Sequence, residues 1–162
     1  MMKKLLLALV TVCMVLSIAW LPVYAAPPTE VSGDFDYEPT IIHDEFRGGN
    51  WFVYATDVEW WTGDLVGTAT SEYLAIFHRS GVATFSSKGV FVGSVLGSEE
   101  GTLEYQLTGV LQAGAEEWQG TWWMGNGTDG LENTHGQGTW DGPGWPGPSP
   151  MCSYEGQVHF DP

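Results

Sequence analysis

Two carboxylates and an indole on one predicted strand have the types and spacing that could do chemistry. Asp57, Glu59 and Trp61 occupy alternate positions, so in a β-strand their side chains share one face. Such a pair could bind the polar group of a ligand, and if buried it could hold the raised pKa that a general acid or base needs. The alternative is a solvated outer strand face, where most acidic residues lie. Asp57 and Glu59 are therefore candidate catalytic residues, with exposure as the competing interpretation.

Tryptophan is the second unusual feature, since eight of the nine tryptophans follow residue 25. In a regular strand the adjacent pairs at 60–61 and 122–123 must point to opposite faces, so one indole of each pair faces the interior. Trp118 and Trp122 share a face, and Trp123 lies on the other. These positions suggest an interior cavity for a small apolar or aromatic ligand, for which a volume of roughly 300 Å³ or more is usual. The residues that we expect to line it are Trp61, Tyr105, Trp118, Trp122 and Trp140.

The sequence contains no recognisable metal or cofactor motif. Its four histidines lack the spacing of a zinc site, and the segment Asn126-x-x-Asp129 lacks that of a calcium loop. Phosphate-binding loops, dinucleotide fingerprints and the G-x-S-x-G of many hydrolases are also absent. Cys152 is the only cysteine after residue 25, so the mature chain cannot form an internal disulfide. We predict neither a metal nor a cofactor.

Residues 1–25 are predicted to be a signal peptide. Two lysines at 3–4 precede an apolar run from Leu5 to Leu21, and residues 23–25 resemble a cleavage site. We expect residues 26–32 to form a short mobile leader and the mature protein to be secreted, with no membrane contact after cleavage. Removal of both lysines leaves three basic residues against 20 acidic ones, a net charge of −17. This charge disfavours nucleic acid and anionic membranes as partners, because both attract cationic surfaces.

The rest of the chain is predicted to form β-strands. No stretch after residue 25 has the 3.6-residue apolar period of a helix, whereas Thr102–Leu111 and Ser153–Phe160 alternate apolar and polar residues. Pro39 marks an edge or a bulge. The 22 glycines favour a strongly bent sheet that closes on itself. We predict an all-β fold, a single closed antiparallel β-barrel of about eight strands over residues 33–162, with a Pro/Gly-rich loop at 142–150.

A repeated Gln-Gly-Thr-Trp, at 119–122 and 137–140, frames a glycine-rich segment. Between the two copies lie Gly125, Gly127 and Gly130, which tolerate the positive φ of a tight turn. We predict a hairpin that turns at these glycines and helps to close the barrel. Any binding is then expected on the strand face that points inward and not in the turn.

Several short motifs resemble those of one family of small barrel proteins. They are Trp61-x-Gly63-x-Leu65-x-Gly67-Thr68, Ser80-Gly81-x-Ala83-x-Phe85, Gly101-Thr102-Leu103-x-Tyr105 and the glycine-rich run from Gly120 to Trp140. Together they resemble DUF3224 proteins and, more remotely, the allene oxide cyclase and dirigent barrels. The resemblance implies an eight-stranded antiparallel barrel without an established activity. The remote relatives hold a reactive, largely apolar intermediate inside the barrel, and their trimeric families make a homo-oligomer plausible.

Three functions are compatible with these features. The first is a binding protein that holds a small apolar or aromatic ligand in a Trp-lined barrel. The second is an isomerase- or cyclase-type enzyme, or a dirigent-like protein, that acts on an apolar intermediate with Asp57 or Glu59 as the acid–base group. The third is a carbohydrate-binding or assembly module that uses surface tryptophans. A barrel interior without a cavity above roughly 300 Å³ would remove the physical basis of the first two functions. A carboxylate inside a cavity would favour the second, and a flat row of exposed indoles without a cavity would favour the third.

Overall fold

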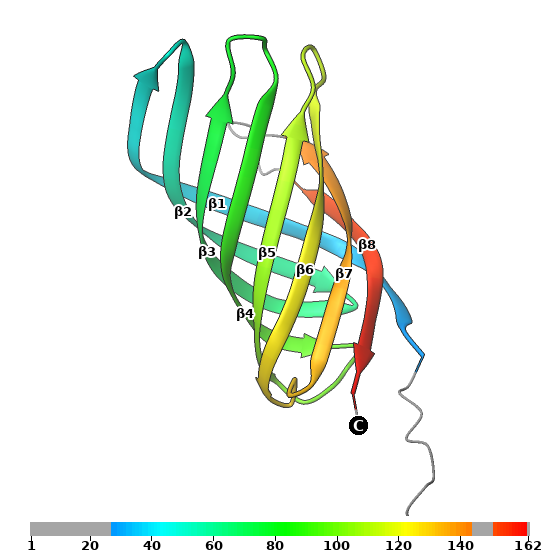
Figure 1. Cartoon of the computed structure of the whole chain (residues 1–162). Helices are drawn as coiled ribbons and strands as arrows, with labels where there is room; N and C mark the ends of the chain where they lie inside the picture. Colours follow the sequence, from blue (N-terminus) through cyan, green and yellow to red (C-terminus); the bar gives the residue numbers. More distant parts are fainter. Residues whose placement is uncertain (1–26, 144–150, 162) are drawn as a thin grey trace, which may run out of the picture.

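Eight antiparallel strands form one closed ring in the computed structural model, which describes residues 27–143 and 151–161. Each strand pairs with the next along the chain, and β8 returns to pair with β1 (Figure 1). The strands are β1 (Thr29–Arg47), β2 (Asn50–Gly63), β3 (Leu65–Phe77), β4 (Ala83–Val95), β5 (Gly101–Leu111), β6 (Glu117–Asp129), β7 (Thr134–Pro143) and β8 (Cys152–Phe160). The predicted all-β, eight-stranded antiparallel barrel is confirmed.

The period-two pattern places apolar side chains inside the ring and polar ones outside. In β5, Leu103, Tyr105 and Leu107 are buried, whereas Glu104 and Gln106 between them are exposed. This division is the one expected for strands with one dry and one wet face. Within the described ranges there is no helix long and apolar enough to cross a membrane.

Two predicted boundaries are wrong. β1 begins at Thr29 and not at Gly33, so the predicted leader loses four residues that pair with the far end of β8. The reason is visible in Val31, which is buried and so continues the inward alternation towards the N-terminus. At the other boundary, Gly142 and Pro143 belong to β7, while residues 144–150 of the predicted loop lie outside the described part of the chain.

The predicted glycine hairpin exists, but its turn lies later than expected. Gly125 and Gly127 are inside β6, and the chain turns between Asp129 and Thr134. There the Leu131 N–H donates to the Thr128 carbonyl, 3.1 Å away. Gly127 serves close packing, because a Cβ at that position would collide with the Leu131 carbonyl.

The two ends of the barrel differ. One end carries the β2–β3, β4–β5 and β6–β7 connections, which lie in the lower half of Figure 1. Large apolar side chains fill this end. These fully buried residues are Leu65, Phe91, Val95, Leu103 and Leu131. The opposite end carries the β1–β2, β3–β4 and β5–β6 hairpins, which rise at the top of Figure 1. The ring is therefore closed by packing at one end only.

In the described ranges, β1 is paired on both sides only from Gly33 to Phe35. Residues Thr29–Phe35 pair with β8, whereas the register with β2 runs on to Arg47. Pro39 lies beyond Phe35, in the part of β1 that pairs with β2 alone, as predicted for an edge, where proline is tolerated. A bulge follows between Ile41 and His43. Proline and bulge both discourage the addition of another strand at this edge.

Candidate binding cavity

A cavity opens at the hairpin-bearing end of the barrel. Its volume is about 170 Å³, and most of its wall is aromatic. The lining residues are Phe35, Tyr37, Trp51, Val53, Asp57, Glu59, Tyr73, Ala75, Phe77, Phe85, Leu107, Trp118 and Trp140. The two candidate carboxylates thus lie in the same cavity as eight aromatic rings. The interpretation of Asp57 and Glu59 as residues of a solvated outer face is wrong, because they are only 6% and 1% exposed.

The cavity contains two of the five aromatic residues predicted to line it. Trp118 and Trp140 are part of its wall, whereas Trp61, Tyr105 and Trp122 are buried outside the lining. All five side chains are buried on the inner side of the ring, as a ligand contact requires. Strand alternation could assign them to a shared face. It could not place them along the barrel axis, which depends on the stagger between strands.

Glycines on neighbouring strands make room for the indoles of the wall. A Cβ at Gly109 would lie 2.8 Å from the Trp140 ring, and one at Gly120 would strike the same indole. The ring therefore lies against bare backbone, where its Nε1 donates to the Thr108 carbonyl at 3.0 Å. Trp118 meets Phe85 edge-to-face, with ring centroids 6.2 Å apart. These contacts fix the orientation of both indoles.

Trp61 lies between the cavity lining and the packed end of the barrel. It stacks on Phe35 with ring centroids 4.6 Å apart, and it also contacts Phe91, Tyr105 and Tyr154. The indole is almost completely buried. Trp61 therefore separates the open part of the barrel from the packed end, and it holds a carboxylate on its upper side.

Glu59 is held by two donors. One carboxylate oxygen accepts a hydrogen bond from Trp61 Nε1 and the other from the Tyr105 hydroxyl, each at 2.8 Å. Burial, and next the charge of Asp57, raise the pKa of Glu59 from 4.5 to about 8, although both donors oppose the shift. Trp61 and Tyr105, predicted as ligand contacts, thus act on the cavity through Glu59.

Asp57 is joined to a chain of hydroxyl groups. The Ser71 hydroxyl donates to Asp57 Oδ1, and the Ser87 hydroxyl donates to Ser71 Oγ at 2.9 Å. All three side chains are buried, on β2, β3 and β4 respectively. Burial raises the pKa of Asp57 to about 6, and the hydrogen bond from Ser71 partly opposes this shift. Because Asp57 and Glu59 interact, they titrate as a pair.

No basic side chain in the described ranges balances this pair. The three basic residues there are Arg47, Arg79 and Lys88, and all three are exposed. Arg47 pairs with Glu45, at 3.7 Å, and none of the three contributes to the pKa of Asp57 or Glu59. The cavity therefore combines a mostly apolar wall with negative charge and contains no positive charge from the described part of the protein.

Several lining residues were missed, although the signal for some was present. Trp51 and Val53 have the same parity as Asp57 on β2, so extending the alternation backwards would have placed them on the cavity face. Tyr37 and Tyr73 come from strands whose faces had not been assigned. Tyr73 feels the charge of Asp57 as well as burial, and the two together raise the pKa of its hydroxyl to about 12.

Two other reactive groups lie away from the cavity. Cys152 is fully buried, and burial raises the pKa of its thiol to about 12, so it is a packing residue and not a nucleophile.

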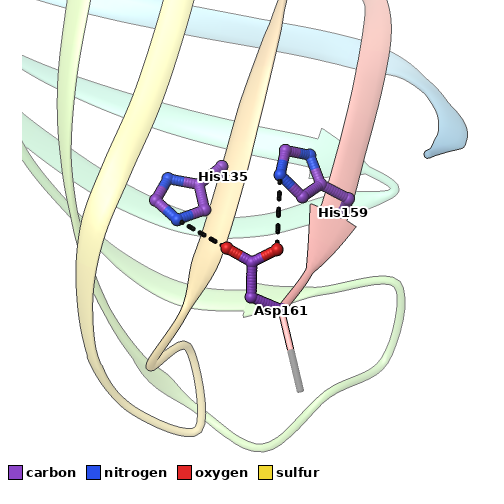
Figure 2. A network of polar contacts seen from close by, with 3 residues as sticks. All are labelled: His135, His159 and Asp161. Carbon is purple, nitrogen blue, oxygen red and sulfur yellow. Dashed lines mark ion pairs between the residues drawn. The ribbon is translucent and has the colours of Figure 1, made fainter. Parts of the chain in front are cut away.

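At the opposite end, His135 and His159 both approach Asp161, at 3.3 and 3.8 Å (Figure 2). Their rings stack at 5.3 Å and all three side chains are partly exposed. Across the described ranges, no group of three or more His, Cys, Asp or Glu side chains could hold a metal ion.

The fold and the cavity together define a class, a small all-β barrel with one open, aromatic end. The family model described as "Protein of unknown function (DUF3224)" matches residues 42–143, and the chain belongs to this family. It is also similar to the crystal structure of a DUF3224 protein with unknown function from Shewanella oneidensis MR-1. The sequences are 22% identical, the TM-score is 0.64, and the match covers 84% of this chain and 99% of the other. No curated protein matches the chain.

Proposed function

We propose that this protein binds a small, mainly apolar or aromatic ligand in the open end of its barrel. The observation that carries the proposal is a cavity with eight aromatic lining residues that also contains two buried carboxylates. Binding sites typically combine an apolar wall with a few converging polar groups in this way. We further propose that the protein acts outside the cytoplasm, after removal of the N-terminal segment.

The size of the cavity limits the ligand. A volume of about 170 Å³ is smaller than the roughly 300 Å³ expected from the sequence, so the expectation of a cavity for a drug-sized ligand is wrong. It is close to that of an engineered cavity of about 150 Å³ that binds benzene. The part of the ligand inside the barrel is therefore about one ring in size, and a larger ligand would extend beyond the rim.

Tryptophan fluorescence tests binding directly, because Trp51, Trp118 and Trp140 all line the cavity. We expect soluble single-ring compounds to change the emission in a saturable way. Ala75→Phe, which adds a ring at the cavity wall, should abolish the change. Val58→Phe introduces the same ring on the outer face of β2 and is the matched control. A panel of ring compounds that leaves the emission unchanged would contradict the proposal.

An acid–base enzyme of isomerase or cyclase type is the second candidate. It is favoured by Asp57, a cavity-lining carboxylate whose pKa is raised to about 6. A general acid or base is most effective when its pKa lies near the pH at which the enzyme works. The test is deuterium exchange next to the carbonyl of a small aryl ketone in D₂O, followed by NMR. Exchange by the wild-type protein that is lost in Asp57→Asn supports the enzyme, whereas binding without exchange supports the binding protein alone.

The carbohydrate-binding or assembly alternative gains less support. Trp60 and Trp123 are 43% and 36% exposed, but they lie on β2 and β6, with three strands between them. In the described part of the chain the exposed indoles therefore do not form the flat row expected of a sugar-stacking surface.

A further inference from the structure

The charge and the rings of the cavity together indicate the class of its ligand. We propose that the cavity selects a small organic cation, an amine or quaternary ammonium attached to an apolar or aromatic group, over a neutral molecule of the same shape. This inference rests on the function proposed above and names its ligand class.

The first argument is the unbalanced charge. Asp57 and Glu59 are buried on one face of β2, and no basic side chain of the described ranges approaches either carboxylate. A buried carboxylate without a counter-ion is costly, since it has lost its hydration and gained no opposite charge. A cation that enters the cavity would supply that opposite charge, which neither a neutral ligand nor an anion can do.

The second argument is the hydrogen-bond pattern around the pair. Glu59 already accepts one hydrogen bond at each oxygen, from Trp61 and Tyr105. Asp57 accepts a hydrogen bond from the Ser71 hydroxyl, and Ser71 Oγ accepts one from the Ser87 hydroxyl. These donors are neutral, so they orient the carboxylates without cancelling their charge. The protein thus holds both carboxyl groups in place, and at pH 7.5 the negative charge of Asp57, whose pKa of about 6 lies below that pH, stays available to a ligand.

The third argument is the arrangement of the rings. Phe85 meets Trp118 and Trp140 at interplanar angles of 71° and 81°, and Phe77 meets Trp118 at 86°. Edge-to-face packing turns neighbouring ring planes in different directions, so the rings of the wall lie around the cavity at several orientations. Cations are attracted to such faces, and aromatic cages are the usual sites for quaternary ammonium groups.

The charge of the whole protein acts in the same direction. The sequence has a formal net charge of −15 at pH 7, with 20 acidic residues against five basic ones. Such a surface raises the local concentration of cations and lowers that of anions. The net charge of the protein therefore attracts cations from a distance, and the buried carboxylates favour them inside the cavity.

Three probes that share one ring and differ mainly in charge provide the test. These are benzylamine, benzyl alcohol and benzoate, titrated at pH 7.5 with tryptophan fluorescence and calorimetry as readouts. We expect benzylamine to bind the wild-type protein about tenfold or more tightly than benzyl alcohol, from a charge-assisted hydrogen bond and cation–π contact. Benzoate should bind more weakly than both.

Variants identify the source of the preference. Asp57→Asn should reduce the amine-to-alcohol affinity ratio at least about threefold, and Asp57→Asn combined with Glu59→Gln should bring it within about twofold of unity, while benzyl alcohol still binds. Glu155→Gln removes an exposed acid on the outer face of β8 and should keep the wild-type ratio. Near-UV circular dichroism verifies that each variant is folded.

The outcomes separate the two proposals. If benzyl alcohol binds as tightly as benzylamine to the wild-type protein, the cation preference is wrong and the aromatic binding site stands. A tenfold preference that survives in the folded double variant also overturns the inference. If none of the probes binds, the proposed function fails together with its ligand class.

Discussion

Replacing Glu59 by glutamine should stabilise the protein at high pH, because there the ionised Glu59 side chain is a buried negative charge that destabilises the folded state. The pKa of Glu59 is raised from 4.5 to about 8. Between these values the folded protein binds more protons than the unfolded chain, so its stability falls as pH rises. No penalty exists below pH 4.5, and the full penalty is reached above about pH 8. Asp57, raised from 3.8 to about 6, changes stability in the same direction at lower pH.

The magnitude follows from the same pKa values. Each pH unit costs about 1.4 kcal/mol, which gives about 5 kcal/mol for Glu59 as an upper value, since part of it arises from repulsion by Asp57. Glutamine keeps an oxygen for Trp61 and offers an N–H₂ to the Tyr105 hydroxyl, which can rotate to accept. This rearrangement costs about 1 kcal/mol. We therefore expect Glu59→Gln to gain about 2 to 4 kcal/mol at pH 9 and to lie within about 1 kcal/mol of wild type at pH 5.

Urea unfolding followed by tryptophan fluorescence measures this difference at pH 5, 6, 7.5 and 9. The stabilisation by Glu59→Gln should grow steadily across the series. Glu155→Gln is the matched control, since its side chain is exposed, and its difference from wild type should not vary with pH. Parallel pH profiles for wild type and Glu59→Gln would refute the argument, because they would mean that burial does not perturb this carboxyl group.

Three further predictions concern packing, the thiol and the N-terminus. Gly120→Ala should destabilise the protein by about 2 to 4 kcal/mol in urea unfolding. The added Cβ would strike the Thr108 carbonyl and the Trp140 Nε1, which are hydrogen-bonded to each other. An unchanged unfolding midpoint would contradict this packing. Cys152 should react with a thiol reagent only after denaturation, since it is fully buried with a pKa raised to about 12, and rapid labelling of the native protein would be the opposite result. Protein exported from a bacterial host should begin at Ala26, as read by intact-mass spectrometry, and a mature chain that keeps Lys3 and Lys4 would show that no signal peptide is removed.

Alternation predicted which side chains share a face, but not which face lies inside. Asp57, Glu59 and Trp61 do share one, and Trp122 and Trp123 do point to opposite sides. The sequence leaves the inner face of β2 open because both faces are comparably apolar and aromatic, with Trp61 on one and Trp60 on the other. The usual exposure of acidic residues then favoured the outer face for Asp57 and Glu59. Only closure of the ring, which depends on all eight strands, determines that they are buried.

Depth along the barrel axis was the second property that the sequence did not contain. Trp118 and Trp140 reach the cavity and Tyr105 and Trp122 do not, although all four face inward. The level of each residue depends on the stagger between neighbouring strands. Glycine roles were also only partly predictable. Gly138, in the second Gln-Gly-Thr-Trp, leaves room for the indole of Trp122, which a Cβ there would approach to 2.6 Å.

The pairing of β1 with β8 has a consequence for how the protein is made. Thr29 pairs with Val158, so the ring closes only when the last strand has been synthesised and has reached the first. Until then β1 and β7 are open edges of an acidic but aromatic sheet, and loop-closure entropy opposes this final pairing. Folding should therefore be slow and follow complete synthesis, and a chain that ends before Cys152 should expose two unpaired strands and aggregate.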